Sequence, residues 1–138
     1  MSSKNLILED DKMCFACGRN NAIGLKLRFE LKTDNLIETE FIPQKAYQGF
    51  KDIVHGGIIS LILDESMLNL LWKTGRPAVT ASLTVDFKSA AKVGEGLIFS
   101  ASIDKEDRRI IYAKAQARKK NGGVLIATAF AKCFVIYQ

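Results

Sequence analysis

One histidine, two glycines and one aspartate are the residues of this chain whose types and spacing could support chemistry. His55 is the only histidine, and Gly56 and Gly57 follow it directly, where a long apolar segment begins. The first N–H groups of a helix have no partner within the helix and carry partial positive charge. Glycines at such a position let a ligand approach the backbone closely, as stabilisation of an oxyanion in acyl transfer requires. The alternative is that the two glycines only make a tight turn.

Asp64 is the second candidate, because it lies inside the apolar segment, seven positions after Gly57. A carboxylate among apolar side chains is costly to bury unless it is paired or used. At about 100° per residue, Gly57, Ser60 and Asp64 lie near one face of a helix. The sequence therefore predicts a functional role for Asp64, and the alternative is that Asp64 and Glu65 together mark a solvated stripe. Its neighbour Glu65 is expected to mark a solvated stripe.

The spacing of these groups predicts a shared site. Seven steps of about 1.5 Å put Asp64 about 10 Å along the axis from the helix start. One carbonyl cannot easily contact both Asp64 and a glycine N–H of the same helix. Two antiparallel helices related by a two-fold axis would place the start of one beside Asp64 of the other. We therefore expect a homodimer in which each site uses both subunits.

Cys14 and Cys17 have the spacing of half a zinc site. A structural zinc ion needs about four ligands, and the chain offers no second pair, since Cys133 is remote in sequence. We therefore expect no metal site, and we expect the pair to pack as small residues in a loop. A four-cysteine site shared across a dimer is the alternative. The odd number of cysteines argues against a disulfide framework.

The elements that must position these residues follow from the hydropathy pattern. Alternation predicts a first strand over 25–31 and, after a turn, a second over 36–42. An uninterrupted apolar run predicts a buried helix from about Gly57 to Lys73, ended by Gly75. Further strand-like runs cover 78–88, 96–105, 109–119 and 124–137. One helix among six strands indicates an α+β fold, with an antiparallel sheet wrapped around the helix.

Chain length and net charge further restrict the number of domains and the class of ligand. The 138 residues suit one domain, which we place at 14–138, with 1–13 as an N-terminal arm. The net charge of +5 is spread along the chain, without the basic stripe and interleaved aromatics of a nucleic-acid binder. It suits an anionic small molecule. No apolar run reaches the ~18 residues of a membrane span, and the N-terminus does not resemble a signal peptide. We expect a cytoplasmic protein without nucleic-acid or membrane partners.

Three stretches resemble one known family. The run from His55-Gly56-Gly57 to Asp64-Glu65 resembles the HGG-x6-D/E signature of hotdog-fold acyl-CoA thioesterases, with the phenylacetate-degradation and 4-hydroxybenzoyl-CoA thioesterases as the nearest branch. Residues 89–95 resemble that family's turn after the strand that follows the helix, with alanine in place of its proline. Residues 14–25 resemble the N-terminal segment of one subgroup. The resemblance spans about residues 14–135.

The resemblance implies a hotdog fold that forms dimers, often paired into tetramers. It implies that Asp64 activates water or attacks the thioester, and that the N–H of Gly56 or Gly57 polarises the carbonyl, with His55 beside it. The candidate partners of this machinery are Thr80, where the family often has Ser or Thr near the nucleophilic water, and Gln48, for the Asn or Gln that many relatives carry before the histidine.

The resemblance also implies a ligand that carries phosphate groups. Lys92, Arg108 and Arg109 stand in expected turns and are candidates to bind the phosphates of coenzyme A; the alternative is that they are only solvated. Coenzyme A is part of the substrate, so we expect no separate cofactor. The predicted function is hydrolysis of an acyl- or aryl-CoA thioester by carboxylate-assisted attack of water. The alternative is a non-catalytic hotdog protein that binds acyl groups or CoA as carrier or regulator, and a hotdog dehydratase ranks last.

Overall fold

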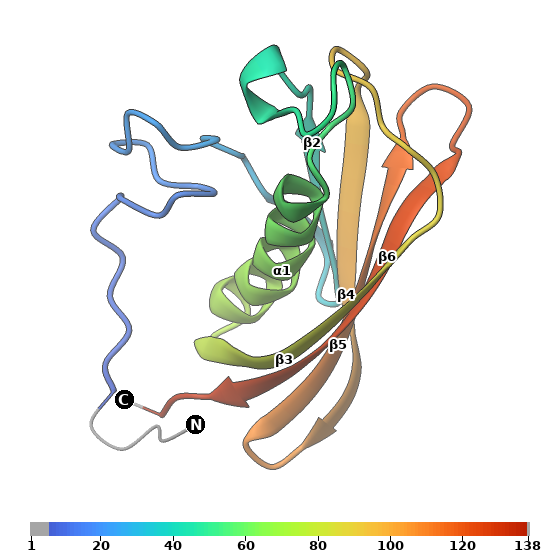
Figure 1. Ribbon diagram of the computed structural model, residues 1–138. Coiled ribbons are helices and arrows are strands. Elements are labelled where there is room, and N and C mark those ends of the chain that lie inside the picture. Colours follow the sequence, from blue (N-terminus) through green and yellow to red (C-terminus); the bar gives the residue numbers. More distant parts are fainter. Residues whose placement is uncertain (1–5, 138) are drawn as a thin grey trace.

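A single long helix lies across a six-stranded antiparallel sheet in the computed structural model, which describes residues 6–137 (Figure 1). The sheet has the order β1-β2-β4-β5-β6-β3, so β3 lies at one edge and β1 at the other. The helix α1 connects β2 to β3 and lies in the concave face of the sheet. The elements are β1 (Glu30–Thr33), β2 (Leu36–Phe41), the 3-10 helix η1 (Lys45–Tyr47), α1 (Gly56–Lys73), β3 (Ala78–Phe87), β4 (Leu97–Asp107), β5 (Ile110–Lys119) and β6 (Leu125–Val135).

Alanines on two adjacent strands, β5 and β6, make room for the helix. The inner faces of β5 and β6 carry three register pairs of buried alanines: Ala113 with Ala131, Ala115 with Ala129, and Ala117 with Ala127. They recur at every second position, as residues on one face of a strand must. The helix fills the space above them with large apolar side chains, including Ile62, Leu63, Met67, Leu70 and Leu71. The core thus sits between α1 and the sheet.

The predicted α+β fold is confirmed, and α1 begins one residue before the predicted start and ends at the predicted Lys73. Gly75 follows the helix in the left-handed conformation (φ +80°), which glycine adopts without strain. The Arg76 N–H then donates a hydrogen bond to the Leu71 carbonyl at the end of the helix. Strands β2 to β6 match their predicted ranges to within about two residues at each end.

The predicted first strand was wrong over most of its length, because β1 covers only Glu30–Thr33. Leu25 and Leu27 donate their N–H groups to the carbonyls of Phe15 and Ala16 instead of to a neighbouring strand. Lys26 between them has φ +52°, which interrupts an extended backbone. The alternation of apolar residues here therefore reflects packing of a loop against the core.

The N-terminal segment runs along the side of α1 that faces away from the sheet (Figure 1). Of the predicted arm, residues 1–5 lie outside the described residues, and residues 6–13 contain neither helix nor strand. Within the described residues, no helix combines the length and apolar composition that crossing a membrane would need.

Candidate active site

The start of α1 is capped by the side chain of His55. His55 precedes the helix with extended backbone, and its Nδ1 accepts a hydrogen bond of 2.8 Å from the Gly57 N–H. An imidazole nitrogen that accepts carries no proton, so this geometry requires the neutral tautomer with its proton on Nε2. The cap uses the Gly57 N–H. The Gly56 N–H donates no hydrogen bond to any described residue, which makes it the more available of the two predicted donors.

Close approach of neighbouring side chains explains why both positions are glycine. A Cβ atom on Gly57 would lie 3.0 Å from His55 Nδ1, inside the space that the cap occupies. A Cβ atom on Gly56 would lie 3.3 Å from the ring of Phe87, at the end of β3. A side chain at either position would press on the helix start. Glycine at these two positions therefore avoids contact of a side chain with the His55 cap and with the Phe87 ring.

Gln48 supports the loop that carries His55. Its Oε1 accepts a hydrogen bond of 2.9 Å from the Asp52 N–H, and its backbone forms an isolated bridge with Val54. His55 N–H donates to the Tyr47 carbonyl at 2.9 Å. In this arrangement the Gln48 side chain closes the loop that positions His55.

Lys92 reaches the same loop from the turn after β3. Its backbone bridges to Ile53, and the neighbouring Ala91 carbonyl accepts the Val54 N–H at 2.9 Å. The Lys92 side chain is exposed and takes part in no ion pair with a described residue. The fold therefore places one predicted cation beside the helix start.

Arg108 and Arg109 lie at the opposite end of the sheet. They form the turn between β4 and β5, and Ile110, which follows them, pairs with Phe134 near the end of β6 where β3 begins. Arg109 stacks over the ring of Tyr137, 5.1 Å from its centroid. Within one chain these two arginines are not brought to the helix start.

Asp64 and Thr80 form the second half of the candidate site. The Thr80 hydroxyl, on β3, donates a hydrogen bond of 2.6 Å to Asp64 Oδ1. Asp64 is half-buried, and burial raises the pKa of its carboxyl, while the Thr80 hydrogen bond acts in the opposite direction. The buried Cys133 is the register partner of Thr80, and burial together with the nearby Asp64 charge raises the pKa of its thiol to about 11. Asp64 is thus a carboxylate with one fixed oxygen beside an uncharged thiol.

The two halves are separate within one chain. Gly56 and Asp64 lie eight residues apart on α1, which corresponds to about 12 Å along the helix axis. The edge strand β3, which holds Thr80, leaves one side of its backbone unpaired, and its central residues 81–84 are exposed. An exposed edge of this kind is a surface on which a second chain can pair.

Glu65 is where the expectation from sequence was wrong. Instead of lying on a solvated stripe, it is half-buried under the N-terminal segment, and its Oε1 accepts hydrogen bonds from Cys14 Sγ at 3.5 Å, Cys17 Sγ at 3.4 Å and Asn69 Nδ2 at 2.8 Å. Burial raises the pKa of the Glu65 carboxyl. The spacing of Glu65 and Asn69 by one helical turn was a signal in the sequence, but the approach of the cysteines depends on the tertiary fold.

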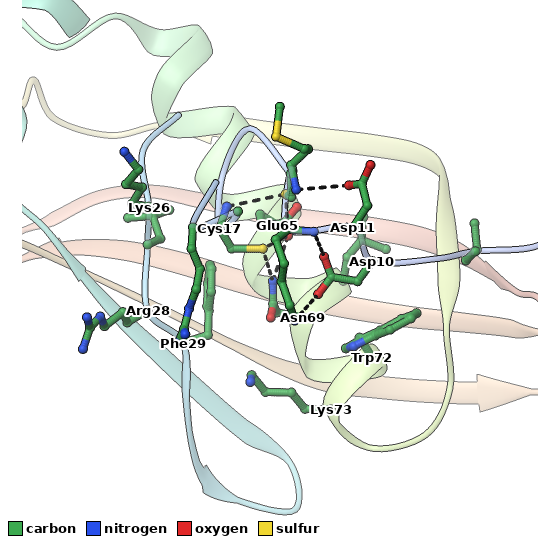
Figure 2. Close-up of a pocket in the computed structure, with 18 of the residues that line it drawn as sticks. Asp10, Asp11, Cys17, Lys26, Arg28, Phe29, Glu65, Asn69, Trp72 and Lys73 are labelled. Atoms are coloured by element: carbon green, nitrogen blue, oxygen red, sulfur yellow. Dashed lines mark hydrogen bonds and ion pairs between the residues drawn. The ribbon is translucent and has the colours of Figure 1, made fainter. Parts of the chain in front are cut away.

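A cleft of about 1000 Å³ lies beside Glu65 rather than Asp64 (Figure 2). It is lined by the N-terminal segment and by α1 residues that include Glu65, Leu68, Asn69 and Trp72. Neither Asp64 nor the helix start contributes to its walls. The cleft is therefore distinct from the Asp64–Thr80 pair.

The chain matches one known protein family over the residues of this candidate site. Residues 51–126, just over half of the chain, match the model of the thioesterase superfamily, and this range contains His55, both glycines, Asp64 and Thr80. The chain belongs to the thioesterase superfamily. This confirms the resemblance seen in the sequence.

Individual relatives agree with that assignment. Acyl-coenzyme A thioesterase 13 from Mus musculus is 29% identical over 76 residues, and the human protein of that name is 28% identical over the same length. Each alignment covers 54% of this chain and 54% of the relative, so the match spans about half the length of these curated proteins.

Solved structures share the fold of this chain. Thioesterase superfamily member 2 from Mus musculus superimposes with a TM-score of 0.74 at 22% identity, over 80% of this chain and 83% of that one. A hypothetical thioesterase from Streptococcus pneumoniae, solved with coenzyme A, gives 0.75 at 16% identity, over 81% and 87%. The latter protein was also solved with alanine in place of an aspartate and, separately, in place of a threonine sixteen positions later.

Proposed function

We propose that this member of the thioesterase superfamily hydrolyses the thioester bond of an acyl- or aryl-coenzyme A. The observation that carries the proposal is the hydrogen bond of 2.6 Å between Thr80 and the half-buried Asp64. A carboxylate whose pKa is raised by burial is a stronger base than an exposed one, and it is held with one oxygen turned to Thr80. The spacing of these two residues equals that of the aspartate and threonine replaced in the pneumococcal thioesterase.

The reaction follows from these groups. Asp64 Oδ2 takes a proton from water as the water oxygen forms a bond to the thioester carbon. The carbonyl oxygen becomes an oxyanion, which the Gly56 N–H at the helix start stabilises. The tetrahedral intermediate then breaks its C–S bond, and the proton held by Asp64 passes to the departing sulfur of coenzyme A. The products are a carboxylic acid and the free thiol of coenzyme A, and the reaction consumes only water and the thioester.

The proposal includes a homodimer. Because the helix start and Asp64 lie about 12 Å apart along α1, a single carbonyl needs Gly56 from one subunit and Asp64 from the other. Antiparallel pairing of two β3 edges around a two-fold axis would extend the sheet and bring the two helices side by side. Further pairing into a tetramer is compatible with this arrangement.

Binding of the coenzyme A phosphates completes the proposal. Lys92 lies beside the loop of His55 and is free of ion pairs within the described chain, so it can approach a phosphate near the helix start. Arg108 and Arg109 lie at the other end of the sheet and would reach the same ligand only from the partner subunit. The cytoplasmic location predicted from the sequence is part of this proposal.

Hydrolysis of a small panel of acyl-CoA substrates tests the proposal. Short aliphatic, long aliphatic and aryl thioesters are incubated with the wild type and with Asp64→Asn, and release of free thiol is followed. We expect a preferred substrate whose turnover falls at least ~100-fold in a folded Asp64→Asn variant, because a general base contributes about that much. Asp34→Asn, an exposed carboxylate in the β1–β2 turn, is the control.

Two outcomes would overturn the proposal. Absence of turnover on every substrate, with acyl-CoA still bound, would favour the non-catalytic carrier or regulator. Turnover that is unchanged in Asp64→Asn would show that another group activates the water.

A further inference from the structure

Three side chains that can bind a metal ion meet where the N-terminal segment crosses α1. Cys14 Sγ, Cys17 Sγ and a carboxylate oxygen of Glu65 all lie within 4.8 Å of one another. Figure 2 shows Cys17, Glu65 and Asn69 turned toward one another beside the cleft. Glu65 lies about fifty residues after the two cysteines in sequence, so the fold itself brings the carboxylate to them. The three groups are not used by the reaction proposed for Asp64.

The local backbone turns both sulfur atoms to the same side. Gly18 N–H donates to the Cys14 carbonyl at 2.8 Å, and Cys17 N–H points at Cys14 Sγ at 3.5 Å. A Cβ atom on Gly18 would lie 2.6 Å from the Cys14 carbonyl oxygen, so only glycine permits this tight turn. This N–H group helps to hold Cys14 Sγ on the side of the turn that faces Glu65.

Within the described residues, the Glu65 carboxylate forms no ion pair with lysine or arginine, so no cationic side chain occupies the place of a metal ion. Asn69 instead holds the carboxylate with a hydrogen bond of 2.8 Å and approaches Cys17 Sγ at 3.8 Å. This is the kind of neighbour that orients a metal ligand from outside the coordination sphere.

We propose that Cys14, Cys17 and Glu65 bind one thiophilic divalent cation of the Zn²⁺ class. Two sulfur ligands select a soft or borderline ion and disfavour Mg²⁺ and Ca²⁺, which prefer oxygen. The three residues supply three ligands of a tetrahedral site, and the fourth position, on the side of the cleft, is taken by water. The ion would tie the N-terminal segment to α1 next to Asp64. This proposal replaces the sequence-based expectation that the two cysteines only pack in a loop.

Metal content and the absorption of a Co²⁺ derivative test the proposal. The full chain is purified under reducing conditions, supplied with Zn²⁺ or Co²⁺, and dialysed before elemental analysis. We expect one ion per chain, and sulfur-to-metal charge-transfer bands in the Co²⁺ form. The variant Cys14→Ser/Cys17→Ser should retain no ion. Glu65→Gln, which keeps the shape of the side chain, should weaken binding by more than the ~10–100-fold that loss of an outer hydrogen bond costs.

The third cysteine supplies the matched control. Cys133→Ala removes a buried thiol of β6 that is not part of the cluster, and the variant should bind metal as the wild type does. Circular dichroism checks that each variant folds. If the double variant fails to fold, the Glu65→Gln comparison and the Co²⁺ spectrum of the wild type decide.

Several results would overturn the proposal. A wild-type chain without stoichiometric metal, or a folded double variant that keeps it, excludes the site. A Co²⁺ form without sulfur-to-metal bands excludes the cysteine ligands. Loss of two thiols by disulfide formation in the reduced and metal-supplied protein would show that the pair serves redox chemistry instead.

Discussion

Asp64 and Glu65 are neighbours on α1, and the contrast between them separates the two sites that we propose on this helix. Both are half-buried carboxylates, and burial raises the pKa of both. About 100° of helical rotation separates them, so Asp64 meets Thr80 on β3, whereas Glu65 meets Cys14 and Cys17 of the N-terminal segment. The proposed base therefore has a hydroxyl as its neighbour, whereas the proposed metal ligand has two thiols.

The two carboxylates also differ in where their sites are completed. The groups around Glu65 come from one chain and already lie within 4.8 Å of one another. Asp64 lacks an oxyanion donor within reach on its own helix, and we propose that the partner subunit supplies it. If the metal site lies within one chain and the active site is shared between two chains, the same variants should affect metal content and activity differently.

The largest expected effect separates the two functions. Asp64→Asn should lower kcat/KM at least ~100-fold and leave the metal content and the Co²⁺ spectrum as in the wild type. Thiol release and elemental analysis on the same preparation measure both. Loss of metal together with activity in this variant would mean that the two carboxylates act as one site.

The second-largest expected effect is the recovery of activity in mixed dimers. Chains carrying Asp64→Asn are unfolded and refolded together with an equal amount of chains that carry a substitution at Gly56, chosen because it abolishes activity in the variant alone without preventing folding. If the site is shared, half of the dimers are mixed and one of their two sites is intact, so about a quarter of the wild-type activity should return. Activity no higher than that of the two variants assayed separately would place each site within one chain. Metal content should not change on mixing.

Removal of the Thr80 hydroxyl should have a smaller effect. The hydrogen bond from Thr80 opposes the rise in the pKa of Asp64, so Thr80→Val should raise that pKa further. Because the base must be deprotonated, the acid limb of the kcat/KM profile should move to higher pH, and the rate should fall by about 10-fold. Thr33→Val, an exposed threonine on β1 at the other edge of the sheet, should leave the profile in place. An unmoved acid limb in Thr80→Val would separate Thr80 from the titrating group.

The smallest expected effect is on stability, which should increase in Asp64→Asn although activity falls. The pKa of Asp64 is higher in the folded chain than in the unfolded one, so the folded state binds more protons in the window between the two values. Stability contributed by this group is therefore present below the unfolded pKa and is lost as pH rises through the folded pKa. Asp64→Asn should raise Tm at neutral pH by up to about 4 °C, and the gain should vanish in acid. A variant with a lower Tm at neutral pH would contradict the burial penalty.

The sequence predicted those parts of the fold that depend on local pattern. The apolar run of α1 and the alternation of β2 to β6 can be read from neighbouring residues, because burial of one face imposes the period. The segment at Leu25 and Leu27 has the same alternation without forming a strand, since its N–H groups pair with Phe15 and Ala16 and the φ of Lys26 is positive.

The two sites differ in how far the sequence could predict them. Asp64 could be singled out because a carboxylate in a buried helix is costly, and the resemblance supplied Thr80 as its neighbour. The role of Glu65 could not be predicted, because it depends on two cysteines about fifty residues away that approach α1 only in the folded chain. The spacing of Cys14 and Cys17 showed half of a ligand set and gave no sign of the third member.

A single-turnover reaction in water labelled with heavy oxygen tests the role of Asp64 most directly. Enzyme in excess is mixed with its preferred acyl-CoA, and the product acid and the peptide containing Asp64 are analysed by mass spectrometry. If Asp64 activates water, the label enters the product acid in the first turnover and the Asp64 carboxyl stays unlabelled. Label in the Asp64 carboxyl, with an unlabelled first product, would mean that Asp64 attacks the thioester itself and would contradict the proposed mechanism.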